Sequence, residues 1–178
     1  EDLYEPGAVA ADEHGRGTAR LDFDRDGARV GLRPDGLGRL AHDRLKLNRR
    51  ALDAIRKNNV KPALALKPAT PVSAAAPFAK DLAMLLVMTV NPGYMGQKLV
   101  PQTLRKVEQL RKTMGDLGLD CKIAVDGNVN YENVPNMVSA GADVLVGGSS
   151  GLFRHDMPLE NAIARLRELV VEGLKIGR

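Results

Sequence analysis

The sequence predicts an α/β fold built on a parallel sheet, and three observations lead to this prediction. Beyond residue 42, short apolar segments alternate four times with longer segments of helical character. The apolar segments are about five to eight residues long, which is typical of strands in such sheets. Each of them ends in a loop rich in glycine or polar residues. A chain of 178 residues is long enough for one domain with a real core.

The individual elements follow from hydrophobic spacing. In residues 100–118, one face of a helix carries Leu104, Val107, Leu110 and Met114. The continuous apolar run over residues 83–90 indicates a strand buried on both faces. By the same criteria we expect, in chain order, a helix over 42–58, a strand over 60–68, a short helix over 71–81, the strand over 83–90, the helix over 100–118, a strand over 121–125, a helix over 130–141, a strand over 142–148 and a closing helix over 158–174.

Residues 1–42 differ in composition from the rest of the chain. They hold nine acidic residues and six arginines but no lysine, so their formal charge is −3, against +7 for the remainder. No part of them sustains a helical or strand period, and LDFDRDG alternates only briefly. Two interpretations stay open: a flexible acidic arm, or sequence that is not native to the protein, such as a GC-rich gene read in the wrong frame. We therefore expect an anomalous segment, 1–42, followed by a domain over 43–178.

The composition argues against several classes of protein. Hydrophobic residues at 44% and charged residues at 27% are globular values. Aromatic residues make up only 3%, and Lys and Arg do not cluster, so we expect no nucleic-acid partner. No signal peptide and no apolar run of about 18 residues is present, so we expect a cytoplasmic protein without membrane contact. The single cysteine, Cys121, lies in an apolar run and is predicted to be a core thiol.

Three of the predicted strands end in loops that suit an anion. The loops are NPGYMGQ at 91–97, DGN at 126–128 and GGSSGLF at 147–153. Glycine lets the backbone approach a ligand closely, and successive amides can converge on one phosphate. A helix that starts just beyond such a loop adds its positive end. The loops therefore predict a phosphate site formed by residues drawn from all three, namely Gly93, Gly96, Gly127, Gly148 and Ser149.

Asp126 is the carboxylate at the tip of a predicted strand. In a barrel of βα units, the carboxyl ends of the strands form the active face. Asp126 could act there as a general acid/base or as a metal ligand. An Asp-Gly pair also commonly shapes a turn or caps a helix. Its position alone leaves both interpretations open.

Several motifs together resemble the ribulose-phosphate 3-epimerase family. They are LVMTVNPGYMGQKLVPQTLRKVEQLR, IAVDGNVN and AGADVLVGGSSGLF, preceded by VKPALALKPATPV. The resemblance covers residues 42–178 and implies the C-terminal half of a (β/α)8 TIM barrel. It further implies a divalent metal, commonly zinc with iron, manganese or cobalt as alternatives, and epimerisation of a ketose phosphate at C3 (D-ribulose 5-phosphate to D-xylulose 5-phosphate). It makes Asp126 a catalytic acid/base and metal ligand, and it assigns substrate or phosphate contacts to Gly93, Tyr94, Met95, Gly96, Gly127, Asn128, Gly148 and Ser149.

The chain departs from the family pattern in two respects. It reads GYMGQ, DGN and GSSGLF where the family typically has GFGGQ, DGG and GSAIF. The SGLF ending is similar to the allulose-6-phosphate 3-epimerase branch, so a pentose and a hexose phosphate both remain open as substrates. The family's HxDxMDG strand, with a metal His and the second catalytic Asp, has no match, and we interpret LDFDRDG as coincidence. The resemblance thus predicts a catalytically incomplete chain.

Two other interpretations compete with the epimerase. A non-catalytic fragment that binds phosphosugars would expose apolar surface, which favours association into a homo-oligomer. A decarboxylase or synthase on a similar barrel would need a lysine beside the acid, and AVDGN offers none. For the epimerase and for the non-catalytic fragment, the expected partner is a sugar phosphate.

Overall fold

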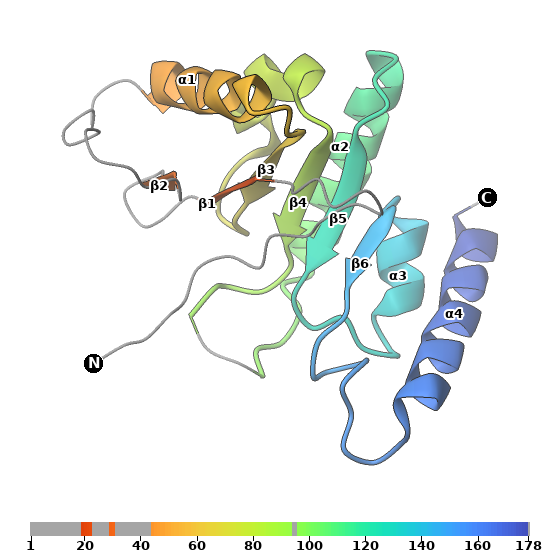
Figure 1. The fold of residues 1–178 in the computed structure, drawn as a ribbon. Coiled ribbons are helices and arrows are strands. Elements are labelled where there is room, and N and C mark those ends of the chain that lie inside the picture. Colours follow the sequence, from red (N-terminus) through yellow and green to blue (C-terminus); the bar gives the residue numbers. More distant parts are fainter. Residues whose placement is uncertain (1–18, 23–28, 31–43, 94–95, 178) are drawn as a thin grey trace, which may run out of the picture.

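A single six-stranded sheet organises the chain (Figure 1). The computed structural model describes residues 19–22, 29–30, 44–93 and 96–177. The strand order is β2-β1-β3-β4-β5-β6, with all neighbours parallel except the antiparallel pair β1 and β2. The strands are β1 Ala19–Asp22, β2 Arg29–Val30, β3 Pro62–Leu66, β4 Met84–Met88, β5 Lys122–Asp126 and β6 Val144–Val146; the helices are α1 Arg44–Lys57, α2 Gln102–Asp116, α3 Val134–Ser139 and α4 Leu159–Ile176.

The predicted α/β alternation is confirmed for the region beyond residue 42. Strands β3 to β6 and helices α1 to α4 each overlap the range that the sequence predicts. One element differs, because the expected helix over 71–81 is two 3-10 helices, η1 Val72–Ala74 and η2 Ala76–Asp81. Pro77 has no amide hydrogen and cannot continue a helical ladder from η1, which accounts for the break near Ala75.

Two short strands lie in segment 1–42, where the sequence predicted no regular element. β1 pairs in parallel with β3, with Leu21 opposite Leu64, and β2 pairs with β1. Strands of four and two residues are too short to show a period of two in the sequence. The hydrogen-bond partners of β1 come from β3, a tertiary contact that a local pattern cannot reveal. The rest of segment 1–42 lies outside the described residues.

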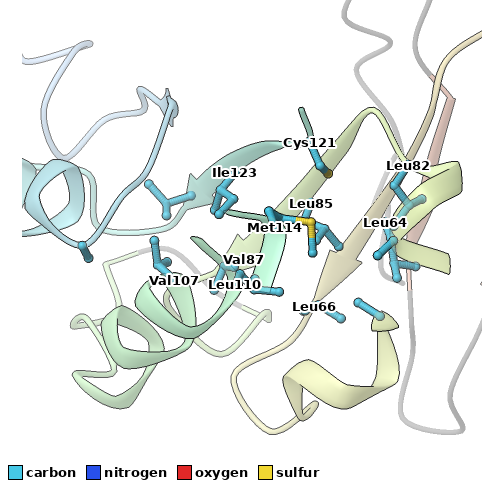
Figure 2. Packing of buried hydrophobic residues seen from close by; sticks show 14 of the residues in the cluster. Leu64, Leu66, Leu82, Leu85, Val87, Val107, Leu110, Met114, Cys121 and Ile123 are labelled. Atoms are coloured by element: carbon cyan, nitrogen blue, oxygen red, sulfur yellow. The ribbon is translucent and has the colours of Figure 1, made fainter. Parts of the chain in front are cut away.

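The main core lies between one face of the sheet and the helices. Alternate residues of the central strands point to this face, as the period of a strand requires. Helix α2 places Val107, Leu110 and Met114 against them (Figure 2). The sheet residues of this core are Leu64, Leu66, Leu85, Val87, Ile123 and Val125.

The second face of the sheet is apolar as well. Ala65, Leu86 and Ala124 are buried there, and Met84 and Met88 pack against them. Towards the β6 edge this face opens, since Val144 and Val146 are 38% and 41% exposed. Both valines are register neighbours of β5 residues on this face. Parallel sheets are normally covered on both sides, so this face matches the interior of a barrel that the described residues cover only in part.

Cys121 is a buried thiol, as predicted. It is free, only 2% exposed and part of the main core. Burial raises the pKa of this thiol, because the low-dielectric core disfavours the thiolate. None of the described helices is both long and apolar enough to cross a membrane.

Candidate functional site

Asp126 lies on the second face of the sheet, at its carboxyl edge. It is the last residue of β5 and is half-buried. In the strand ladder it stands between Met88 of β4 and Val146 of β6. It is two residues beyond Ala124, so its side chain belongs to the same face. This is the position that the sequence predicts for a carboxylate at the mouth of a barrel.

The turn after Asp126 needs a glycine. Gly127 has a φ of +118°, a conformation that other residues rarely adopt. A Cβ atom at this position would also lie 2.6 Å from Cγ2 of Val90. The next residue, Asn128, has a φ of +48° and continues the reversal. The chain thus turns sharply away from the strand directly after the carboxylate.

Three asparagines hold this turn in place. Asn130 donates its side-chain amide to Oδ1 of Asn128 at 3.0 Å. The side-chain amide of Asn133 donates to the backbone carbonyl of Asn128 at 3.0 Å. The backbone amide of Asn133 donates to Oδ1 of Asn130 at 2.9 Å. The side-chain oxygen of Asn128 thus accepts one hydrogen bond within the turn. Because an amide oxygen has two lone pairs, a substrate contact by Asn128, as the resemblance implies, can use either end of the amide.

The loop after β4 extends into solvent. Gly93 and Gly96 are exposed and have φ values of +150° and +80°, and an added Cβ would meet no atom within 4 Å at either position. Gln97 donates its side-chain amide to the carbonyl of Asn91, which braces the loop. Tyr94 and Met95, the other two predicted contacts in this loop, lie outside the described residues.

The loop after β6 folds around one carbonyl group. The amides of Gly151, Leu152 and Phe153 donate to the carbonyl of Gly148 at 3.3, 2.9 and 3.1 Å. These three amides therefore point back into the loop and not towards a ligand. A Cβ at Gly148 would meet nothing within 4 Å, and Ser149 is exposed, so space remains beside both predicted phosphate contacts.

The loops after β5 and β6 lie against each other. Ser150 donates its hydroxyl to the carbonyl of Val129 at 3.2 Å. A Cβ at Gly151 would lie 2.3 Å from that same carbonyl oxygen, so only glycine permits this approach. The loops after β4, β5 and β6 all leave the carboxyl edge of the sheet, at its lower end in Figure 1. The structure thus gathers there the three loops that the sequence singled out.

The described residues do not form a complete metal site. Within them, no group of three or more His, Cys, Asp or Glu side chains is arranged to hold an ion. Zinc sites in proteins use three or four protein ligands. His155 is exposed, and His14 and His42 lie outside the described residues. Asp126 can therefore supply one ligand of the implied zinc, and the described residues do not fit the rest of the site.

Two buried polar residues near the carboxyl edge were not predicted from the sequence. Thr89 follows β4 and is completely buried. Lys106 of α2 is 8% exposed, and its Nζ donates to the carbonyls of three residues in the loop after β3. A signal for Lys106 was present in the sequence, since it falls at helical spacing on the stripe of Leu110 and Met114. Thr89 likewise interrupts an apolar run.

A family profile and the curated relatives of this chain point to the same family. Residues 40–153 match the profile of the Ribulose-phosphate 3 epimerase family. The ribulose-phosphate 3-epimerase of Methanocaldococcus jannaschii is 41% identical over 125 residues, which are 70% of this chain and 53% of that protein. The enzyme of the same name from Escherichia coli K12 is 40% identical over 101 residues, 57% of this chain and 45% of that protein. The ribulose-phosphate 3-epimerase of Bacillus subtilis is 37% identical over 119 residues, which are 66% of this chain and 54% of that protein.

The chain spans about half the length of the curated relatives it matches. The matched region contains β3, β4, β5 and β6 with the loops at their carboxyl ends. These four parallel βα units are part of a (β/α)8 barrel. Since the profile covers more than half of the sequence, the chain belongs to the ribulose-phosphate 3-epimerase family.

Proposed function

We propose that residues 43–178 form the part of a ribulose-phosphate 3-epimerase that holds the sugar phosphate and supplies one of the two acid/base groups, Asp126. One observation carries the proposal. Asp126 ends β5 on the apolar second face, and no other strand from β3 to β6 ends in a carboxylate. The glycine loops of the two neighbouring strands leave the same edge of the sheet.

The chemistry explains why a carboxylate at this place is useful. The C3 proton of a ketose phosphate is acidic because it lies next to the C2 carbonyl. The Asp126 carboxylate takes this proton, which leaves an enediolate on C2 and C3. Inversion requires that a second acid return a proton to the opposite face of C3. A single carboxylate can return a proton only to the face from which it took one.

The phosphate would bind where the three loops meet. Gly148 and Ser149 are the proposed donors of the last loop, and the amides of residues 151–153 are already used within it. Gly93 and Gly96 offer open backbone in the loop after β4, and Tyr94 and Met95 belong to this proposal as side-chain contacts. D-ribulose 5-phosphate is the proposed substrate, because the relatives compared above are named ribulose-phosphate 3-epimerases.

Three further expectations stay predictions. Zinc remains the proposed metal, with Asp126 as one of its ligands, and metal analysis of the purified protein tests it. Residence in the cytoplasm and association into a homo-oligomer are also unproven parts of this proposal. Light scattering of the purified chain measures its oligomeric state directly.

Hydrogen isotope exchange tests the role of Asp126. The chain is incubated with D-ribulose 5-phosphate in D2O, and the C3 proton is followed by NMR. One acid/base group predicts that deuterium enters at C3 with retained configuration. Asp126→Asn should lower this exchange by at least about 100-fold, the lower end of general acid–base contributions.

The control for this experiment is Asp120→Asn. Asp120 precedes the other end of the same strand, its side chain is 91% exposed, and it pairs with Lys122 at 3.2 Å. Its exchange rate should match that of the unaltered chain. Exchange that persists in Asp126→Asn would refute the role of Asp126. If the unaltered chain neither binds nor exchanges the sugar phosphate, the proposed function itself is wrong for this chain.

A further inference from the structure

Thr89 is a buried polar residue that contacts the backbone of the candidate site at Asp126 and Gly127. It follows the last residue of β4 and has no exposed surface. Its amide donates to the carbonyl of Asp126 at 2.7 Å. Its hydroxyl lies 3.0 Å from the same carbonyl oxygen and 2.5 Å from the carbonyl oxygen of Gly127. The side chain thus contacts both peptide groups that follow the carboxylate.

The hydroxyl contacts are additional to the sheet. An amide-to-carbonyl bond from β4 to β5 continues the ordinary parallel ladder in which Met88 stands opposite Asp126. A threonine hydroxyl has one proton, which the two carbonyls can share. By contacting both carbonyls, Thr89 restrains the two peptide planes on either side of Gly127. These planes fix the direction in which the chain leaves Asp126.

Thr89 also closes the loop after β4. Its own carbonyl accepts the amide of Val100 at 2.8 Å, so the base of the loop over residues 90–99 is held at the same residue. Gly93 and Gly96 lie within that loop. One residue therefore joins the end of β5 to the base of the loop that the proposed function assigns to the phosphate.

We propose that Thr89 is a positioning residue, whose hydroxyl sets the orientation of Asp126 relative to the loop after β4. The inference rests on the acid/base role proposed for Asp126. A shift of the carboxylate by even about 1 Å can lower a rate by about 100-fold, because proton transfer depends steeply on the alignment of the reacting atoms. Thr89 itself touches neither the substrate nor the reacting proton.

The test compares three variants of the full chain. Thr89→Val removes the hydroxyl and keeps the shape of the side chain, whereas Thr89→Ser keeps the hydroxyl. Thr103→Val is the matched control, since Thr103 is also buried and its hydroxyl donates to the carbonyl of Val100 at 2.6 Å, two residues before the start of α2. Both valine variants lose one buried hydroxyl bond of similar kind. They differ in whether that bond reaches Asp126.

Two measurements are made on each variant. The first is amide hydrogen exchange over residues 126–130, which does not depend on catalysis. The second is the deuterium exchange rate at C3 of D-ribulose 5-phosphate, resolved into kcat and KM. We expect Thr89→Val to speed amide exchange in this segment by about tenfold, as the loss of one hydrogen bond predicts. Its kcat should fall by about 10- to 100-fold with KM changed less than about twofold.

The remaining variants decide the interpretation. Thr89→Ser should restore both quantities to within about threefold, and Thr103→Val should leave amide exchange over residues 126–130 unchanged. Equal amide exchange in Thr89→Val and Thr103→Val would overturn the positioning role. So would a kcat of Thr89→Val that equals that of Thr103→Val. If the unaltered chain shows no C3 exchange at all, the proposed function has failed, and the amide exchange alone still decides whether Thr89 holds the turn.

Discussion

Replacing Lys106 with methionine should destabilise the fold more than any surface substitution on the same helix. Nζ of Lys106 donates to the carbonyls of Lys67, Pro68 and Thr70 at 2.9, 2.8 and 2.6 Å. All three acceptors belong to the short loop that connects β3 to η1. Methionine has nearly the same length as the lysine stem, so the variant removes the ammonium group and leaves the packing in place.

The size of the effect follows from opposing contributions. A hydrogen bond to a charged group contributes about 1.5–3 kcal/mol to stability, so three of them contribute about 4.5–9 kcal/mol. Burying the ammonium group opposes this by several kcal/mol. In the variant the three carbonyls lose their donor, although a loop can turn some of them towards water. We therefore expect Lys106→Met to lower the free energy of unfolding by about 2–3 kcal/mol.

Urea unfolding of the variant and of a matched control measures this difference. Lys112→Met alters the same helix, but the Lys112 side chain is 77% exposed and pairs with Asp116 at 2.6 Å. Such an exposed pair contributes about 0.5 kcal/mol or less. If Lys106→Met loses no more stability than Lys112→Met, the three carbonyl contacts do not hold the loop after β3.

Two other predictions concern stability. Burial lowers the pKa of Lys106 below its ordinary value of 10.5, so between the lowered pKa and 10.5 the unfolded chain binds a proton that the folded chain does not. The free energy of unfolding should therefore rise with pH in this window, relative to Lys106→Met. Urea unfolding of both proteins at a series of pH values approaching 10.5 measures this difference, and a relative fall would contradict the prediction. In α4, Gly173→Ala would place a Cβ 2.6 Å from the carbonyl oxygen of Pro135, so we expect a loss of about 2 kcal/mol despite the better helix propensity of alanine. Gly115→Ala in α2 meets nothing within 4 Å and should instead stabilise by about 0.5 kcal/mol, and thermal unfolding of both variants checks the contrast.

Much of the fold was predictable because the strands and helices beyond residue 42 carry clear apolar periods. The run over residues 83–90 gave β4, and the stripe of Val107, Leu110 and Met114 gave α2. The sequence predicted one short helix over residues 71–81, where the structure has two 3-10 helices. The apolar pattern does not show this break, which depends on the missing amide hydrogen of Pro77. β1 was missed for a different reason, since its partner strand lies about 40 residues further along the chain.

The candidate site was predictable where it depends on single positions. The tip of a strand identified Asp126, and glycine-rich loops identified the turns around it. The contacts that hold these groups could not be derived from local sequence. The hydroxyl of Thr89 meets carbonyls 37 and 38 residues away, and the ammonium group of Lys106 meets carbonyls 36 to 39 residues away. Only the assembled sheet brings such partners together.

The buried Cys121 allows local opening of the core to be measured by chemical labelling. A single thiol that is 2% exposed reacts with a soluble thiol reagent only when the core around β5 opens. The raised pKa of the thiol slows any reaction in the closed state further, because the thiolate is the reactive form. The labelling rate of unaltered protein therefore measures how often the strand that carries Asp126 separates from its helices, without any added probe.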